Sequence, residues 1–371
     1  MGKIVDFITR DSGVIVCIYV EEWWKVKTTF FRLLYSLRVA LLASIWEKPG
    51  KWKRVARAPS RRYEAANAVV NGKLYVFGGW NGQEIQAMTR VDVYNPTSDR
   101  WSRHVSALPL PATHANAEAD GSTIWFVGGF VGDSAHKKTT NLAFKYETKT
   151  NSWHPAPPLP TATASGALVR LGRSLHYFGG FLDRDTTTGN HYVLSLDGGT
   201  QWETRAPLPK VRGHHAGVAV GGKLYAVGGQ FLHDSPNVKD LNFVHVYDPK
   251  TDSWQELTSL PVPCSHHEMS TIAIKGKIVV IGGLNRNNKL LGKRGLSHIF
   301  SYDPKTDKWT ELSPLPVGLF GASAKVIGNH IIITGGADLL TPDTSQVTTL
   351  LGRRTLIEEV LENQRSRTKS S

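Results

Sequence analysis

A short apolar run followed by two glycines recurs six times along this chain. Each run has about four mostly apolar residues without polar alternation, which is typical of a strand buried on both faces. Successive glycine pairs are 50, 51, 49, 54 and 53 residues apart. A fixed period near 50 residues indicates a repeat architecture in which neighbouring units cover one another. The copies are Leu74–Gly79, Ile124–Gly129, Leu175–Gly180, Leu224–Gly229, Ile278–Gly283 and Ile331–Gly336.

A tyrosine and a tryptophan seven positions apart accompany four of these runs. Turn-forming residues lie between the two aromatic residues, which predicts a hairpin. The pairs are Tyr94 and Trp101, Tyr146 and Trp153, Tyr247 and Trp254, and Tyr302 and Trp309. The third copy keeps Trp202, but Ser195–Gly199 replaces the tyrosine and its turn. A Leu-Pro pair then follows, as at Leu108-Pro109.

Together these marks resemble the kelch repeat over roughly residues 50 to 350. The resemblance implies an all-β, six-bladed kelch-type β-propeller, with one four-stranded sheet per blade and the Tyr and Trp side chains packed between blades. Trp52 has no tyrosine before it, and the last unit has no tryptophan after Gly336. We therefore expect the strand near Trp52 to complete the blade begun near Phe320 and to remove two open sheet edges. The propeller is predicted to span 48–352, and truncation of residues 48–58 is expected to open the ring.

The segments outside the repeats carry weaker patterns. Residues 1–47 contain an apolar stretch, 28–46, that Arg32 and Arg38 interrupt, so it is too short to span a membrane. An export signal, an amphipathic helix and an unstructured leader are the three interpretations, and membrane contact is expected only through 28–46. Location therefore stays open between exported, membrane-associated and cytoplasmic. For 353–371 we expect a short helix and a basic disordered tail.

Composition adds little about partners. The formal net charge of +13 favours anionic partners through long-range attraction, but no nucleic-acid-reading motif accompanies it. Two cysteines, Cys17 and Cys264, are too few for a disulfide framework or a four-thiolate zinc site. No cofactor is indicated.

A short turn precedes each glycine-ended strand, and its second residue, always a glycine, offers a way to align the blades. Ten positions before that glycine lie Arg62, Arg212 and His266, and seven before it lie His114 and His215. Kelch repeats often place arginine, and histidine or a small residue, at these positions. The resemblance thus implies structural roles for Arg62, Arg212, His114 and His215.

Histidines are concentrated in the fourth and fifth blades, within Val211–His215 and Cys264–Glu268. Imidazole and carboxylate groups are metal ligands and proton carriers, so both a metal site and a polar channel lining are interpretations. If these segments are regular strands, their side chains alternate between two faces. The candidate residues then divide into two sets that would not meet at one site. The first set is His214, His266, Glu268 and Arg212, and the second is His215 and His267.

The loops after the glycine pairs vary in length, as binding loops on a rigid scaffold do. The most basic of them contains Arg286 and Lys289 and is the first choice for an acidic ligand. The expected ligand-binding residues are Arg62, His114, Arg212, His214, His266, Arg286 and Lys289.

Two functions fit this pattern. The first is a non-catalytic scaffold that binds a protein or glycan through loops on one propeller face. The second is a carbohydrate-directed enzyme, either a sugar epimerase or a galactose-oxidase-like oxidoreductase, with its site at the channel mouth. No Gly-x-Ser-x-Gly elbow, phosphate-cradling loop or His-Glu-x-x-His motif is present. The catalytic candidates are His215, His267, Glu268 and Arg212.

Overall fold

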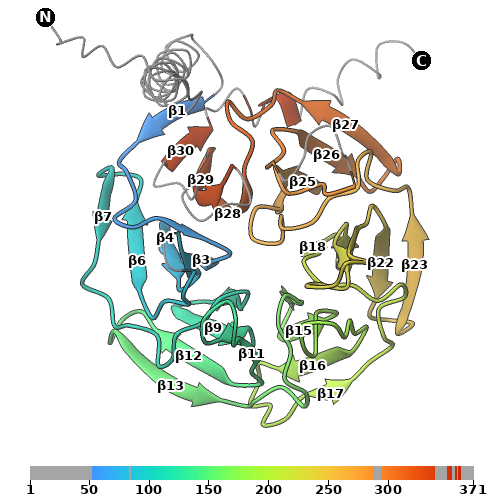
Figure 1. The fold of residues 1–371 in the computed structure, drawn as a ribbon, viewed down its shortest axis with the longest axis horizontal. Helices are drawn as coiled ribbons and strands as arrows, with labels where there is room; N and C mark the ends of the chain where they lie inside the picture. The colour runs from blue at the N-terminus through green and yellow to red at the C-terminus, as the bar shows by residue number, and fades with distance from the viewer. Residues whose placement is uncertain are drawn as a thin grey trace, which may run out of the picture. The chain divides into compact units, whose positions relative to one another are not determined.

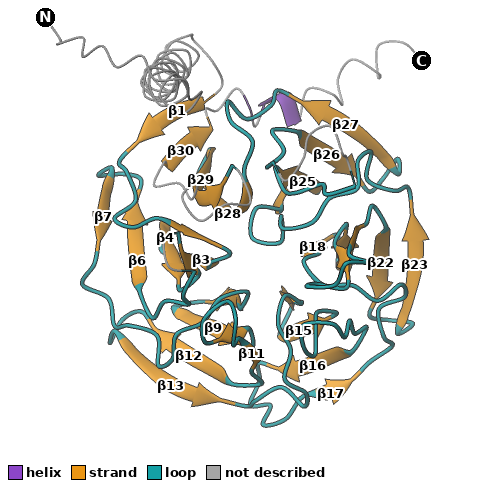
Figure 2. Ribbon diagram, viewed as in Figure 1, coloured by secondary structure: helices purple, strands orange, loops and turns teal. Residues whose placement is uncertain are grey.

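Each expected unit forms one four-stranded antiparallel sheet, and six such sheets are arranged around a common axis (Figure 1). The computed structural model describes residues 52–82, 85–287, 294–338, 349–352, 356 and 358–360. The predicted leader 1–47 and most of 353–371 lie outside these residues. Strands dominate the described part, and Leu356 and 358–360 are helical (Figure 2). None of the helical structure in the described part is long and apolar enough to cross a membrane.

The strands of each blade are hydrogen-bonded in order from the axis outward. The first three blades contain β3 (Ala66–Val70), β4 (Lys73–Phe77), β6 (Val91–Asn95) and β7 (Arg100–Ser102); β8 (Asn116–Asp120), β9 (Thr123–Val127), β12 (Ala143–Glu147) and β13 (Ser152–Ala156); and β14 (Ala167–Leu171), β15 (Ser174–Phe178), β16 (His191–Ser195) and β17 (Glu203–Thr204). The next two contain β18 (Ala216–Val220), β19 (Lys223–Val227), β22 (Val244–Asp248) and β23 (Ser253–Leu257); and β24 (Ile272–Ile274), β25 (Lys277–Ile281), β26 (Ile299–Asp303) and β27 (Lys308–Leu312).

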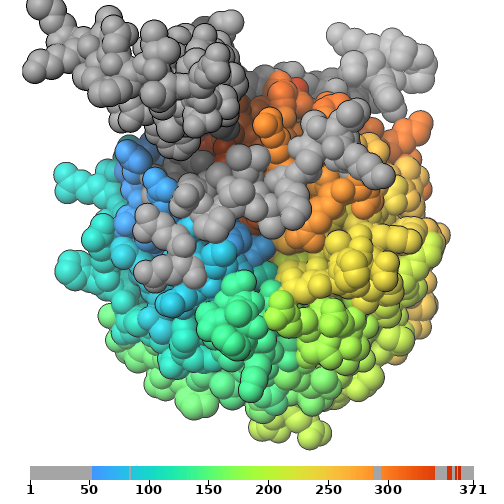
Figure 3. Space-filling view, viewed as in Figure 1, coloured from blue at the N-terminus to red at the C-terminus, as the bar shows by residue number. Residues whose placement is uncertain are grey.

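The sixth blade joins the two ends of the propeller, which confirms the expected closure. It contains β28 (Phe320–Ile327), β29 (His330–Ala337), β30 (Thr349–Gly352) and β1 (Trp52–Val55). β1 pairs antiparallel with β30, with Trp52 opposite Gly352 and Val55 opposite Thr349. In Figure 1 the blue β1 lies beside the red β30, and Figure 3 shows the successive blades following one another in chain order around the axis.

Antiparallel strand order divides the connections between two faces. The tight turns between the first two and the last two strands of a blade lie on one face, which we call the turn face. The loops after the glycine pairs and the connections between blades lie on the other, the loop face. Three two-stranded ribbons belong to the loop face: β2 (Arg62–Tyr63) with β5 (Trp80–Asn81), β10 (Phe130–Val131) with β11 (Lys138–Thr139), and β20 (Gln230–Phe231) with β21 (Lys239–Asp240).

The glycine pairs let neighbouring blades approach closely. A Cβ atom on Gly78 would lie 2.2 Å from the carbonyl oxygen of Ala112 in the next blade. Gly79 donates its N–H to the same oxygen at 2.9 Å. Both glycines have positive φ, 57° and 88°. The close approach and the backbone conformation together exclude a side chain here, because L-residues are strained in this region.

The tyrosine–tryptophan hairpins form a second contact between blades, which we call the interblade clamp. Tyr302 donates its hydroxyl to Asp307 Oδ1 at 2.6 Å, and the backbone N–H of Thr258 in the preceding blade donates to the same atom at 3.0 Å. Trp309 Nε1 donates to the Thr258 carbonyl at 3.0 Å. Equivalent clamps use Asp99, Asn151 and Asp252.

Two blades depart from the clamp, and each departure has a local explanation. In the third blade Trp202 still donates to a carbonyl, that of Pro157, at 2.9 Å. In the other clamps, the residue at the position of Pro157 donates its backbone N–H to the acceptor side chain. Proline has no N–H, so the loss of the tyrosine and of that acceptor leaves no donor unpaired. In the sixth blade no turn connects β30 to β1. There, Glu359 from the helical segment accepts the N–H of Ser313 at 3.1 Å.

Candidate functional site

Six residues with left-handed backbone conformation encircle the axis, one from each blade. We call them the axial ring. Each of five donates its N–H to the carbonyl of the ring residue in the preceding blade, at 2.7–3.1 Å. These backbone contacts link the six residues in sequence, with the His214–His266 step the one that has no such bond, and they fix where the five side chains begin. The ring consists of Glu64, His114, Ser165, His214, His266 and Gly321, with φ between 49° and 59°.

The ring brings one carboxylate and three imidazoles together in a buried site. Glu64 Oε2 lies 2.9 Å from His114 Nε2, and Glu64 Oε1 lies 3.4 Å from His266 Nε2. The rings of His214 and His266 stack with centroids 3.8 Å apart. All four side chains are at most 5% exposed. The small Ser165 and Gly321 separate these residues into two adjacent pairs.

Each ring histidine has its other nitrogen, Nδ1, next to an oxygen atom. Ser265, which contacts His266, also donates to the buried carboxylate of Asp240 at 2.5 Å. These contacts orient the imidazoles so that their Nε2 atoms face the axis. The Nδ1 contacts are Thr113 Oγ1 with His114 at 3.0 Å, Glu268 Oε1 with His214 at 2.9 Å, and Ser265 Oγ with His266 at 2.7 Å.

A fourth imidazole, His233, reaches the ring from the loop between β20 and β21. Its Nδ1 lies 3.3 Å from His214 Nε2, and its Nε2 lies 3.0 Å from Lys137 Nζ. The ring of His233 stacks on Phe130 and Phe181, with centroids 5.8 and 5.2 Å away. The sequence marked this loop as a candidate binding loop but did not single out His233.

Burial sets the charge of this cluster. It lowers the pKa of His214, His233 and His266 well below the usual range, and neighbouring imidazoles lower it further. Burial also raises the pKa of Glu268 to about 7. For Glu64, burial is the largest single influence and raises the pKa, but the contacts with His114 and the charges of His214 and Lys137 together outweigh burial, so the net shift is downward. The neutral forms of His214 and His266 are therefore favoured beside the Glu64 carboxylate, an arrangement suited to a hydrogen-bonded network or to a cation.

The expected catalytic residues do not form one site. His215 and His267 point away from the axis, and each packs against the first glycine of the preceding blade's pair, Gly179 and Gly228. His267 Nδ1 lies 2.8 Å from Thr271 Oγ1. Glu268, in contrast, contacts the axial ring through His214.

Arg62 and Arg212 brace their own blades. Each is buried and donates at 3.2 Å to a carbonyl of the second strand, Val76 and Ala226 respectively. Arg62 also pairs with Asp92, while Arg212 lies 3.1 Å from His245 Nδ1 at the corresponding place. Arg286 donates its backbone N–H to Asp240 beside the ring. Lys289 lies outside the described residues.

The turn glycine gave the wrong register between blades. It is the first residue of the turn in the second, third and sixth blades and the second residue in the others. His114 and His215, aligned by that count, are therefore not equivalent: His114 corresponds to His214. Counting from the glycine pair would have found the axial ring, because five of its members lie 14 residues before the first glycine. The fifth blade has two additional residues.

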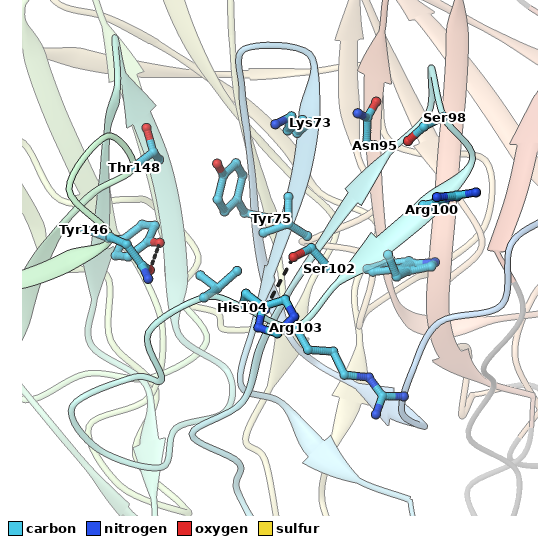
Figure 4. A pocket seen from close by; sticks show the side chains of 14 residues that line it. Lys73, Tyr75, Asn95, Ser98, Arg100, Ser102, Arg103, His104, Tyr146 and Thr148 are labelled. Atoms are coloured by element: carbon cyan, nitrogen blue, oxygen red, sulfur yellow. Dashed lines mark hydrogen bonds between the residues drawn. The ribbon is translucent and has the colours of Figure 1, made fainter.

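Hollows are also present in other parts of the described structure. A groove of about 660 Å³ opens between the first two blades, where Lys73, Arg100 and Arg103 lie near Tyr75 and Tyr146 (Figure 4). A second hollow of about 340 Å³ is lined by the innermost strands and, in part, by Glu268. The sequence predicted neither the groove nor its combination of cations and aromatic rings.

Comparison with known proteins agrees with this architecture. The KLHDC2/KLHL20/DRC7 Kelch-repeats domain model matches residues 114–336, and the Kelch motif model matches 61–103. A kelch repeat-containing protein of Arabidopsis thaliana is 25% identical over 84% of this chain and 77% of its own length. Kelch-like protein terF of Aspergillus terreus is 23% identical over 78% of this chain and 65% of its own length. Kelch-like protein 35 of Mus musculus is 26% identical over 81% of this chain, which spans only 47% of that relative. The chain belongs to the kelch-repeat family.

Proposed function

We propose that this kelch protein is a non-catalytic scaffold that binds a protein partner through its loop face. The observation that carries the proposal is a series of hydrogen bonds between the described loops of neighbouring blades, from the first blade to the fifth. A surface held in one conformation before binding loses little entropy when a partner docks. The bonds are Ser134 N to Ile85 O (3.1 Å), Thr139 Oγ1 to Leu182 O (2.7 Å), Arg184 Nη1 to Ala135 O (2.9 Å), Asp234 N to Arg184 O (3.2 Å) and Asn287 Nδ2 to Asp240 O (2.8 Å).

Exposed apolar side chains support the same face. Among the described residues, the large apolar side chains that are clearly exposed are Leu142 (45%), Val211 (38%) and Phe231 (38%). All three lie in connections of the loop face. Phe231 is the strongest candidate of the three for an anchor, because aromatic side chains are enriched in protein interfaces. The basic net charge of +13 adds attraction toward an acidic partner.

The enzyme alternative gains no comparable support. Its four candidate side chains are at most 5% exposed, and they divide between blade packing and the axial ring. A glycan partner likewise has no specific site among the described residues that favours it over a protein.

Quantitative affinity purification from the native cells tests the proposal. The wild-type protein is compared with Phe231→Asp and with a control variant, Asn329→Asp. Asn329 is exposed in the turn between β28 and β29, so the control places the same negative charge on the turn face. We expect Phe231→Asp to lose a partner that Asn329→Asp retains, and the purified partner to bind the first variant at least about tenfold more weakly. Equal binding by both variants would refute the loop face as the docking surface.

A further inference from the structure

The axial ring places several metal-ligand atoms around one point. One ligand atom from each of Glu64, His214 and His266 lies within 4.8 Å of the other two. The same holds for His114, His214 and His233. Glu64 joins the two sets, since its carboxylate also lies 2.9 Å from His114 Nε2.

One of these atoms is unsatisfied. His114 Nε2 is buried, and its contact with Glu64 Oε2 at 2.9 Å does not meet the geometric criteria for a hydrogen bond, although the short distance still lowers the pKa of Glu64. Buried polar atoms are nearly always paired, so an orphan inside a polar cluster calls for an explanation. An ion bound between the carboxylate and the imidazole nitrogen would supply the missing partner.

The outer contacts of the ring histidines have the form found around bound metals. A ligating histidine usually donates its second N–H to a carboxylate, hydroxyl or carbonyl, which fixes its tautomer and leaves the inner nitrogen as a lone-pair donor. Thr113, Glu268 and Ser265 occupy these outer positions. All three inner atoms are therefore Nε2, and they come from three different blades. The rings of His214 and His266 are stacked, so one ring must tilt for both lone pairs to reach one ion.

We propose that the axial ring binds a divalent transition-metal ion, zinc in the first place, through the Glu64 carboxylate and Nε2 of His114, His214 and His266. Three imidazoles and one carboxylate match the ligand number of a closed zinc site. Magnesium and calcium prefer all-oxygen sites, and thiolate ligands, which would favour softer ions, are absent from the cluster described.

His233 is a neighbour of this ion rather than a ligand. The ammonium group of Lys137 can only donate, so His233 Nε2 accepts and its hydrogen stays on Nδ1. That N–H has an acceptor in Gln230 Oε1 at 3.3 Å. His233 with Phe130 and Phe181 then covers the site on the side of the β20–β21 loop.

The ion would join the first, second, fourth and fifth blades at the axis. The third and sixth blades contribute Ser165 and Gly321 to the ring, and these small residues leave the space to their neighbours. The role inferred is structural, independent of the partner bound at the loop face.

Metal content and stability of the untagged full chain test the proposal. Purified without added metal and then equilibrated with zinc, the protein should hold about one zinc ion per chain by elemental analysis. Removal with a chelator should lower Tm by roughly 5 °C or more, and zinc but not magnesium should restore it. Cobalt substitution should give weak visible bands without thiolate charge transfer. Less than a tenth of an equivalent in the zinc-equilibrated protein would overturn the proposal.

Variants separate ligands from neighbours. We expect His214→Gln and the isosteric Glu64→Gln to lose the zinc or bind it at least tenfold more weakly. His233→Asn and His215→Asn, the latter a buried histidine outside the ligand set, should keep the full equivalent. Retention of full zinc content by His214→Gln, or equal loss in His215→Asn, would contradict the assigned ligands. Cobalt spectra of the wild type decide the question if a ligand variant fails to fold.

Discussion

Removal of β1 should destabilise the propeller far more than removal of the residues before it. A chain that begins at Arg57 lacks β1 and Ala56, whereas a control chain that begins at Lys51 keeps both. The first deletion leaves β30 with an open edge and removes the four residue pairs between β1 and β30. The second leaves every described blade intact.

The structure gives the size of the effect. Trp52 is only 7% exposed, and loss of a buried tryptophan side chain costs about 3–5 kcal/mol. Ala56 donates to Asp99 at 2.8 Å and accepts from Trp101 at 3.0 Å, and these two bonds add about 1 kcal/mol each. The sum, about 5–7 kcal/mol, approaches the whole stability of many domains.

Thermal and urea unfolding of both chains, followed by circular dichroism, measure the difference. We expect the Arg57 chain to unfold at least about 10 °C below the Lys51 chain, or to be unfolded from the start. Midpoints within about 2 °C of each other would show that β1 does not hold the ring closed, and the closure argument would fail.

Two further predictions concern single residues. Asp307→Ala removes the acceptor for Tyr302 and Thr258, so the free energy of unfolding in urea should fall by about 2 kcal/mol. Asp197→Ala, in the third blade, which has no clamp, should change it by less than about 0.5 kcal/mol, and equal losses would refute the clamp. Burial, followed by the nearby His191, lowers the pKa of His176 to about 3. The neutral form is therefore favoured in the folded state, and stability present above pH 6.5 is lost as pH falls toward 3. His176→Asn should reduce the loss of stability between pH 7 and pH 4.5 by roughly 2–3 kcal/mol, and an unchanged pH profile would contradict this origin.

The architecture was accessible from the sequence because its determinants are local and repeated. A glycine pair after an apolar run specifies a close blade contact, and the unpaired Trp52 specifies where the ring closes. The sequence pattern does not reveal the axial ring, although it marks three of the ring residues, His114, His214 and His266, as candidates. The turn glycine shifts by one position between blades, so a count from it places His114 opposite His215. The two extra residues of the fifth blade likewise place His266 opposite Arg62 and Arg212.

The cluster around the ring depends on contacts that no local pattern encodes. His233 reaches His214 only because the β20–β21 loop folds over the ring, and a loop histidine carries no periodic signal. Separation of His214 and His266 from His215 and His267 follows from alternate residues pointing in opposite directions. The sequence could not predict that His214 and His266, rather than His215 and His267, lie close to Glu64, which comes from the first blade.

The position of β1 imposes an order on biosynthesis. About 300 residues separate β1 from β30, so β1 leaves the ribosome long before its partner strand exists. Glu359, which substitutes for the last clamp, is made later still. Throughout that interval β1 is a free edge, and the adjacent charges of Lys53 and Arg54 oppose pairing with strands of other nascent chains. The pairing of β1 with β30 is therefore the last step in closing the ring. Until then, the charged residues of β1 reduce its pairing with other chains.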